Sequence, residues 1–159
     1  MELILLDDDS DANYEILENG TTVVSFDTTE VFTTLSDFKN FPNLKSLTLT
    51  DIGLSDIRNL ADCKNLELLW LDDNSIVDIS PLTSLKKLRF LSLCNNQIRD
   101  VSSLEDMTTL QYLDLEGNEV IDYSPLYGLS GLEILYVDVD SMTDSELEAL
   151  VFALPNCNI

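Results

Sequence analysis

The chain has no histidine and only 8 Lys and Arg side chains, against 30 Asp and Glu among its 159 residues. The absence of histidine excludes a Ser-His-Asp triad, a Cys-His nucleophile and any His-containing zinc site. The formal net charge of −22 repels phosphates and anionic lipid headgroups, which argues against nucleic acid or a membrane as a partner. The same charge favours a basic protein partner, because it would accelerate that partner's approach.

Cysteines and long apolar runs are also scarce. The three cysteines (Cys63, Cys94 and Cys157) lack metal-ligand spacing, which favours reduced thiols in the cytoplasm. The N-terminal apolar run ends at Leu6 with no basic residue before it, unlike a signal peptide. No segment approaches the roughly 18 apolar residues of a membrane span. We therefore predict a cytoplasmic protein, or a secreted one if a signal peptide has been removed.

What the chain has is a regular repeat of leucine. Hydrophobic residues make up 45% of the sequence, enough for a sizeable core in one domain. Leucine recurs every 22 residues, at Leu44, Leu66, Leu88, Leu110, Leu132 and Leu154. The segments that begin there, such as LELLWLDDNSIVDI and LRFLSLCNNQIRDV, fit the pattern L-x-x-L-x-L-x-x-N-x-[IVLM]. The asparagine position holds Asn74, Asn96 and Asn118, but Ile52 and Asp140 in the first and last repeats.

These repeats resemble the leucine-rich repeat family in its 22-residue form. Segments DISPLTSLKKL and DYSPLYGLSGL are similar to the internalin-type repeats of bacteria and to the phosphatase-regulator type of eukaryotes. The resemblance covers residues 44–159. It implies a solenoid that binds proteins on its concave face.

Side-chain periodicity predicts the same architecture without the family. Positions 4 and 6 of each repeat point to one side of a short strand, so stacked parallel strands bury their leucines in a continuous core. We expect the asparagines to bond backbone groups at the turns, and Pro81 and Pro125 to begin short convex helical or 3₁₀ turns. The convex core is predicted to contain Ile57, Ile79, Val101 and Tyr123, then Leu60, Leu82, Leu104 and Leu126. The fold class is thus an α/β solenoid with a parallel concave sheet.

Caps are predicted at both ends of one continuous unit. Residues 1–43 form an N-terminal cap, in which the β-prone runs NYEIL and TTVVSF flank the hairpin signal Asn19-Gly20. A degenerate first repeat follows, with Phe32, Leu35, Phe38 and Phe41 on its convex side. Residues 44–159 hold five repeats and a helical cap at 145–153, begun by a Ser145–Glu148 capping box. Its apolar stripe is Leu147, Leu150, Val151 and Leu154, and Cys157 and Ile159 continue into one more short strand.

Aspartate also recurs every 22 residues, at Asp56, Asp78, Asp100, Asp122 and Asp144. A ladder of carboxylates for cations is one interpretation. The favoured one is a turn or N-cap aspartate that accepts backbone N–H bonds at the start of each convex segment.

A second acidic motif lies in residues 7–18. Asp7, Asp9, Asp11, Asn13 and Glu18 match positions 1, 3, 5, 7 and 12 of a calcium loop. Ala12 stands where the sharp turn requires glycine, and no helix fits before Asp7. The favoured interpretation is a solvated turn, and no cofactor is predicted.

Positions 3, 5 and 7 point away from the leucines, and position 8 begins the rim. They place aromatic residues beside acids on the concave face. Aromatic anchors with a charged rim are typical of binding surfaces. The alternative interpretation is that the rings only pack on one another across neighbouring strands. The predicted protein-binding residues are Leu68, Trp70, Asp72, Asp73, Phe90, Tyr112, Asp114, Glu116, Tyr136 and Asp138.

We therefore predict a monomeric, non-enzymatic module that binds a basic protein, for example as an inhibitor or immunity protein. One alternative is a scaffold or regulatory adaptor whose acidity mainly serves solubility. A more distant alternative is a metal-dependent hydrolase that uses Asp72, Asp114, Glu116 and Asp138. An open sheet provides no water-excluding pocket for such chemistry.

Overall fold

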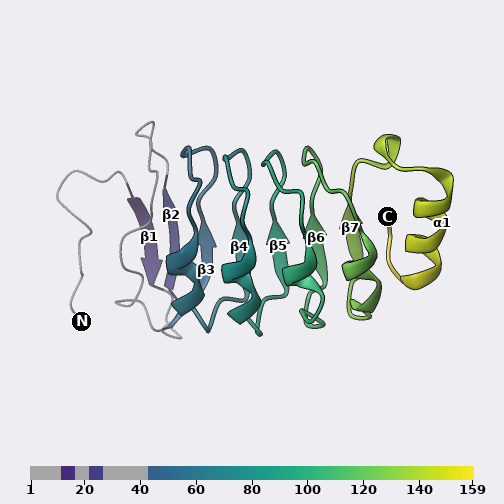
Figure 1. The fold of residues 1–159 in the computed structure, drawn as a ribbon. Helices are drawn as coiled ribbons and strands as arrows, with labels where there is room; N and C mark the ends of the chain where they lie inside the picture. The colour runs from purple at the N-terminus through teal and green to yellow at the C-terminus, as the bar shows by residue number, and fades with distance from the viewer. Residues whose placement is uncertain (1–11, 17–21, 27–42) are drawn as a thin grey trace.

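A single sheet of seven strands runs through the part of the chain that the computed structural model describes, residues 12–16, 22–26 and 43–159 (Figure 1). Strands β1 (Ala12–Ile16) and β2 (Thr22–Phe26) pair antiparallel, and from β2 onward every neighbouring pair is parallel. The repeat strands are β3 (Leu44–Thr48), β4 (Leu68–Trp70), β5 (Phe90–Ser92), β6 (Tyr112–Asp114) and β7 (Ile134–Tyr136). The sheet order equals the chain order, as the repeats predict.

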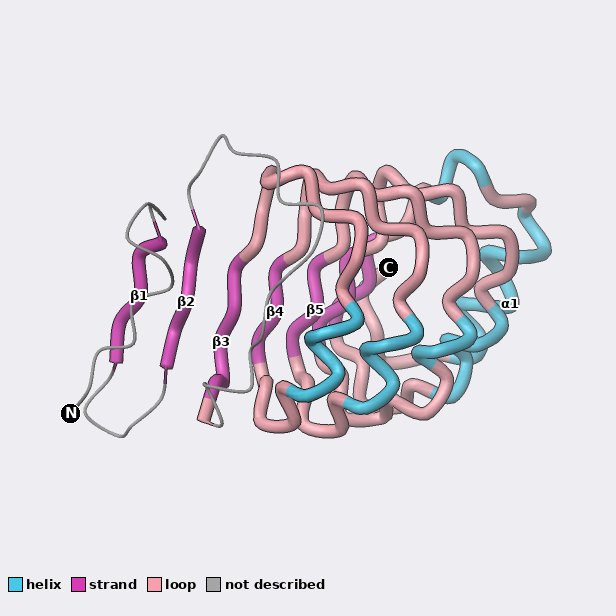
Figure 2. The backbone as a smooth tube through the Cα atoms, turned by 60° about the vertical axis from the view of Figure 1, so that its left-hand side comes forward, coloured by secondary structure: helices cyan, strands magenta, loops and turns pink. Residues whose placement is uncertain are grey.

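Each repeat returns to the next strand through a short 3₁₀ turn on the other side of the core (Figure 2). The turns are η2 (Arg58–Asp62), η3 (Ser80–Ser84), η4 (Ser102–Leu104) and η5 (Ser124–Gly128). Pro81 and Pro125 lie in the first turn of η3 and η5, where no N–H is needed. The α/β solenoid predicted from the sequence is confirmed.

The core is the stack of leucines that the period of two assigns to one face. Leu69 pairs with Leu91 and Leu91 with Leu113 across β4, β5 and β6, and all three side chains are buried. The predicted convex residues are buried opposite them, including Tyr123. Because the repeats have the same length and the same register, equivalent residues of successive repeats stack into continuous apolar rows.

The repeat asparagines satisfy the backbone where it leaves the sheet. Asn96 accepts the N–H of Ile76 at 3.0 Å, and its amide donates to the carbonyls of Leu71 and Leu93 at 2.9 and 3.0 Å. Asn74 and Asn118 make the equivalent bonds in their own repeats. Each amide thus ties two consecutive turns together through groups that would otherwise be buried without partners.

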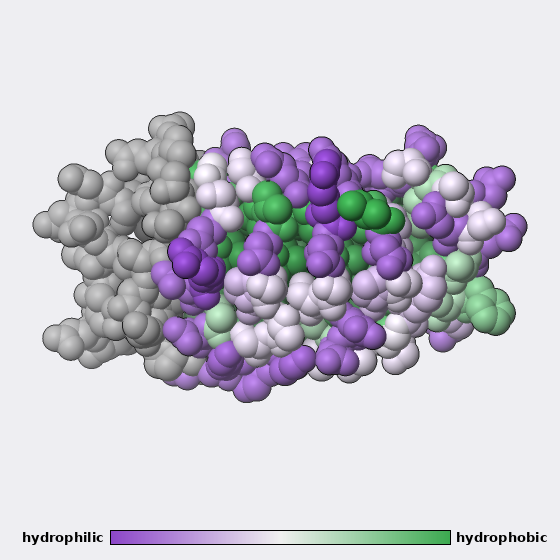
Figure 3. Space-filling view, viewed as in Figure 1, coloured by the Kyte–Doolittle hydropathy of each residue, from purple (hydrophilic) through white to green (hydrophobic). Residues whose placement is uncertain are grey.

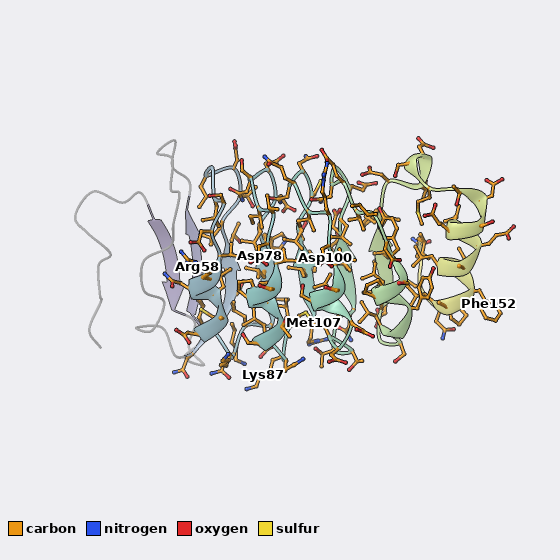
Figure 4. The ribbon with its side chains drawn as sticks, in the orientation of Figure 1. Arg58, Asp78, Lys87, Asp100, Met107 and Phe152 are labelled. Atoms are coloured by element: carbon orange, nitrogen blue, oxygen red, sulfur yellow. The ribbon has the colours of Figure 1, made fainter. Side chains whose placement is uncertain are left out.

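Four of the five recurring aspartates form the predicted turns. Asp78 accepts the backbone N–H of Ser80 at 2.8 Å, and Asp100 accepts that of Ser102 at 2.8 Å. Asp56 and Asp122 repeat the contact with Arg58 and Ser124, and Figure 4 shows Asp78 and Asp100 at equivalent points of neighbouring repeats. The fifth assignment is wrong, because Asp144 is the first residue of a helix.

Helix α1 (Asp144–Ala153) follows the last repeat and packs against η5. Its capping box is Thr143–Glu146 rather than the predicted Ser145–Glu148, because Thr143 has the extended backbone of an N-cap and Ser145 lies within the first turn. Leu150 and Leu154 are buried, whereas Val151, predicted to lie in the apolar stripe, is exposed.

The last residues add a single parallel bridge, Ile134 to Asn158, to the sheet. Cys157 and Ile159 pack partly buried against the core on either side of that bridge. The predicted extra strand is therefore present in minimal form, and Cys157 lies at the edge of the core rather than within it.

The N-terminal predictions are tested only in part. The antiparallel β1–β2 pair fits the predicted hairpin. Asn19-Gly20, the degenerate repeat at Phe32, Leu35, Phe38 and Phe41, and the candidate calcium residues Asp7, Asp9, Asp11 and Glu18 lie outside the described residues. Asn13, the remaining member of that candidate loop, lies in β1 opposite Ser25. Within the described ranges, no helix is long and apolar enough to cross a bilayer.

Candidate protein-binding surface

Strand register brings the predicted binding residues onto one face of the sheet. Position 3 aligns Leu68, Phe90 and Tyr112 on β4, β5 and β6. Position 5 aligns Asp114 with Tyr136 on β6 and β7. We call this side of the sheet, turned away from the buried leucines, the concave face.

Four rings cross this face in an unbroken series, which we call the aromatic strip: Trp70, Phe90, Tyr112 and Tyr136. The ring centroids of Trp70 and Phe90 are 4.6 Å apart. Phe90 and Tyr112 stack with centroids 4.1 Å apart and planes 9° apart. Tyr112 and Tyr136 are 5.8 Å apart and tilted by 58°. The strip therefore spans four consecutive strands.

The strip is both packed and accessible. Trp70, Phe90 and Tyr112 are half-buried by their neighbours, while Tyr136 is 42% exposed and Leu68 is 37% exposed. Cross-strand packing, the plainer interpretation of these aromatics, thus accounts for part of their buried area. The remaining apolar area faces solvent beside charged groups, which is typical of an interaction surface.

The predicted acids lie at and just beyond the carboxyl ends of the strands, and we call Asp72, Asp73, Asp114, Glu116 and Asp138 the acidic edge. The repeat strands end at position 5, so position 7 follows the strand rather than belonging to it. Asp72 accepts the N–H of Cys94 at 2.9 Å and the hydroxyl of Ser92. Asp138 accepts the N–H of Gly117 at 2.9 Å. Asp73 accepts the side-chain amide of Asn95 at 2.8 Å. Three of these acids therefore also hold neighbouring turns together.

Position 8 has a structural requirement that the sequence analysis missed. Asp51, Asp73, Asn95 and Gly117 all have a left-handed backbone, with φ of 55°, 57°, 54° and 68°. Asp, Asn and Gly are the residues that tolerate this conformation. The side chain of Asn95 fills the space beside Gly117, so that a Cβ at residue 117 would lie 2.1 Å from its Oδ1 atom. The recurrence of these residue types every 22 positions was the available signal.

Asp114 is the most unusual member of the acidic edge. Burial, followed by repulsion from Glu116 and Asp72, raises its pKa, although a hydrogen bond from the Glu116 N–H opposes the shift. Burial and the Asp114 carboxylate also raise the pKa of Tyr112 to about 12, so its phenol stays protonated. The centre of the concave face is therefore a partly dehydrated anion between aromatic rings.

Cys94 lies between these acids but is not activated. Burial, followed by the Asp114 and Asp72 carboxylates, raises the pKa of its thiol to about 11. A thiol with that pKa is protonated at neutral pH and is a poor nucleophile. None of the three cysteines forms a disulfide.

Positive charge is placed away from the acidic edge. Within residues 43–159, no Lys or Arg occupies position 3, 5, 7 or 8 of a repeat. Lys45 and Arg89 lie at position 2, at the opposite end of the strands, where they bind Glu67 at 3.0 Å and Gln111 at 2.7 Å. The two basic side chains at the start of the strands therefore lie at the end opposite the acidic edge.

The other described surfaces have fewer features that are typical of a binding site. The face in view in Figure 3 shows hydrophobic atoms among polar ones over the middle repeats and again at the end that carries α1. Phe152, which is 89% exposed, extends from α1 (Figure 4), beside a shallow hollow lined by Leu147, Glu148 and Val151. Within the part of the chain that is described, no three Cys, Asp or Glu side chains are grouped to hold a metal ion.

Solved structures of bacterial repeat proteins share this architecture. Internalin C2 of Listeria monocytogenes is 31% identical, with a TM-score of 0.69, over 80% of this chain and 55% of its own. Internalin InlF of the same species is 27% identical over 82% of this chain and 45% of its own, with a TM-score of 0.59. The Leptospira interrogans LRR protein LIC12759 is 26% identical over 74% and 31%, with a TM-score of 0.68. This chain thus spans about half the length of the two internalins.

A family profile described as Leucine Rich repeats (2 copies) matches residues 64–106, the centre of the array. No curated protein sequence matches the chain. The 22-residue pattern, the asparagine ladder, the parallel sheet with its 3₁₀ turns, and these structural likenesses agree: the chain belongs to the leucine-rich repeat family.

Proposed function

We propose that this chain is a non-enzymatic module that binds a basic protein through its concave face. The observation that carries the proposal is the aromatic strip, half-buried on a solvated sheet and bordered by the acidic edge. Accessible aromatic area provides anchors of the kind that dominate binding energy. The unpaired negative charge selects a cationic surface.

The whole-chain charge supports the same partner. A net charge of −22 attracts a basic protein over distances comparable to the Debye length, about 8 Å at physiological salt. Binding would therefore be fast as well as specific. The concrete version that we propose is a monomeric, cytoplasmic inhibitor or immunity protein that covers a cationic protein. The unpaired cysteines are consistent with a reducing compartment.

A scaffold or regulatory adaptor is the second candidate, in which acidity mainly serves solubility. The two differ in their response to salt. Charge-steered inhibition requires an association rate that falls steeply between low and physiological salt, whereas an adaptor bound mainly by apolar contacts shows little change.

The test replaces one anchor and one matched aromatic residue. The partner is isolated from the native host, and its affinity is measured by calorimetry for the native chain, Trp70→Ala and Tyr127→Ala. Tyr127 lies in η5 and is 37% exposed, so its truncation removes an aromatic side chain from the convex side. We expect Trp70→Ala to cost at least about 2 kcal/mol of binding free energy and Tyr127→Ala to leave affinity unchanged.

Full affinity of a folded Trp70→Ala variant would contradict the assignment of the concave face. If the partner isolated from the native host proves to be an acidic protein, the electrostatic part of the proposal is contradicted.

A further inference from the structure

Tyr112, Asp114 and Tyr136 form a corner at the centre of the concave face. Tyr112 and Asp114 are two residues apart on β6 and so project from the same face. Asp114 is directly paired with Tyr136 on β7. The two rings are 5.8 Å apart and tilted by 58°, and the Tyr112 hydroxyl lies 3.5 Å from Asp114 Oδ2. One carboxylate is thus flanked by two phenol rings.

The environment of the corner differs from that of the rest of the strip. Phe90 covers one face of the Tyr112 ring by stacking on it, whereas Tyr136 meets the ring at a tilt and is itself 42% exposed. The geometry leaves aromatic surface accessible next to the carboxylate.

Among the described residues, no cation is paired with the negative charge of the corner. Asp114 Oδ1 accepts the N–H of Glu116 at 3.0 Å, while Oδ2 has only the long contact with Tyr112. Burial raises the pKa of Asp114, and the two charged groups that add to this shift, Glu116 and Asp72, are also negative. A cation that enters here would relieve both the repulsion and the poor hydration.

We infer that this corner binds an arginine side chain of the partner, with the guanidinium against Tyr136 and Tyr112 and its N–H groups directed at Asp114. A guanidinium is planar, is weakly hydrated and stacks on rings while donating two parallel bonds to a carboxylate. A lysine ammonium is a compact, strongly hydrated charge that gains less from the flat aromatic walls. The inference rests on the proposed function and adds to it the side chain that the site selects.

The test uses three blocked peptides of one design, in which four arginines, four lysines or four citrullines alternate with Gly-Ser spacers. Trp70 is the only tryptophan of the chain and lies on the same face, so its fluorescence reports binding at about 150 mM salt. Amide NMR shifts at Tyr112, Asp114 and Tyr136 locate the contact. We expect the arginine peptide to bind at least about fivefold more tightly than the equally charged lysine peptide, and the citrulline peptide not to bind.

Two variants with the same charge change separate the corner from the overall field. Asp114→Asn keeps the oxygen that accepts the Glu116 N–H and should abolish most of the preference for arginine. Asp106→Asn, at an exposed position between η4 and β6, should retain it. Circular dichroism establishes that both are folded.

Equal affinity for the arginine and lysine peptides in the native chain would overturn the inference, whatever the variants do. So would equal behaviour of the two variants, or shifts confined to residues outside the corner. These failures are distinct from failure of the proposed function. Loss of partner binding in Trp70→Ala would still support the concave face even if arginine showed no advantage at Asp114.

Discussion

Aspartates on the two sides of this solenoid have different surroundings. On the convex side, Asp56, Asp78, Asp100 and Asp122 recur at one repeat position, and each accepts the N–H two residues later. Those hydrogen bonds lower the pKa of Asp100 and Asp122. On the concave side, Asp114 has no counterpart in the other repeats, and burial raises its pKa. The fold favours the charged forms of Asp100 and Asp122, whereas it disfavours the charge of Asp114.

This difference separates residues that build the repeat from residues that the repeat displays. A side chain that returns every 22 residues with the same backbone partner has its identity explained by the turn. Ser92, Asp114 and Tyr136 occupy one repeat position with no common structural task. The concave positions are therefore where this chain differs in chemistry from a generic array, and they are the place to look for its function.

The largest effect should follow loss of a ladder asparagine. Asn96→Ala leaves the Ile76 N–H without its partner in a buried turn and removes one of the two asparagine amides that donate to each of the Leu71 and Leu93 carbonyls. We expect the free energy of unfolding to fall by about 2 to 3 kcal/mol, measured by urea denaturation. Gln97→Ala, at the exposed neighbouring position, is the control and should change it by less than about 0.5 kcal/mol. Equal losses would show that the ladder does not support the fold.

A smaller effect, of opposite sign on the two faces, should follow neutralisation of Asp100 or Asp114. Because the pKa of Asp100 is lowered from its ordinary value of 3.8, its ionised form stabilises the fold at any pH above 3.8. This contribution is lost as the pH falls through the folded-state pKa. The raised pKa of Asp114 means that its ionised form destabilises the fold at neutral pH, and that the penalty disappears as the pH falls below 3.8.

At pH 7 we therefore expect Asp100→Asn to lower the free energy of unfolding and Asp114→Asn to raise it. Both differences from the native chain should shrink in acid. Each variant removes one negative charge, so the change in overall repulsion is matched. Denaturation curves at neutral and acid pH measure the two differences, and a shift of the same sign in both variants would refute the contrast between the faces.

Most of the fold follows from the sequence because a repeat specifies it several times. The period of 22 residues predicts the sheet order, the asparagine ladder and the proline positions in η3 and η5, since like residues must align for their leucines to form one core. Repeat position alone predicts that Tyr123 belongs to that core, and Tyr123 is buried.

Non-repeating features were harder to predict. The capping box was misplaced by two residues because Thr143 and Ser145 both precede an acid by three positions, and only the backbone conformation distinguishes them. The composition of the aromatic strip could be predicted from strand alternation, but its partial burial and the stacking of Phe90 on Tyr112 depend on side-chain packing. The left-handed backbone of Asp73 shows that one predicted binding residue also has a structural reason to be there.

The central claim is that the partner docks on the concave face, so that a charge there contributes more to association than an equal charge elsewhere on the chain. The most direct measurement is the association rate at low and physiological salt for two doubly neutralised variants. Asp73→Asn with Glu116→Gln alters the acidic edge, and asparagine tolerates the left-handed backbone at residue 73. Glu105→Gln with Asp106→Asn removes the same charge from exposed positions beside η4. We predict that the first pair slows association several-fold at low salt and flattens its salt dependence, while the second leaves both within about twofold. Equal slowing by the two pairs would contradict the account.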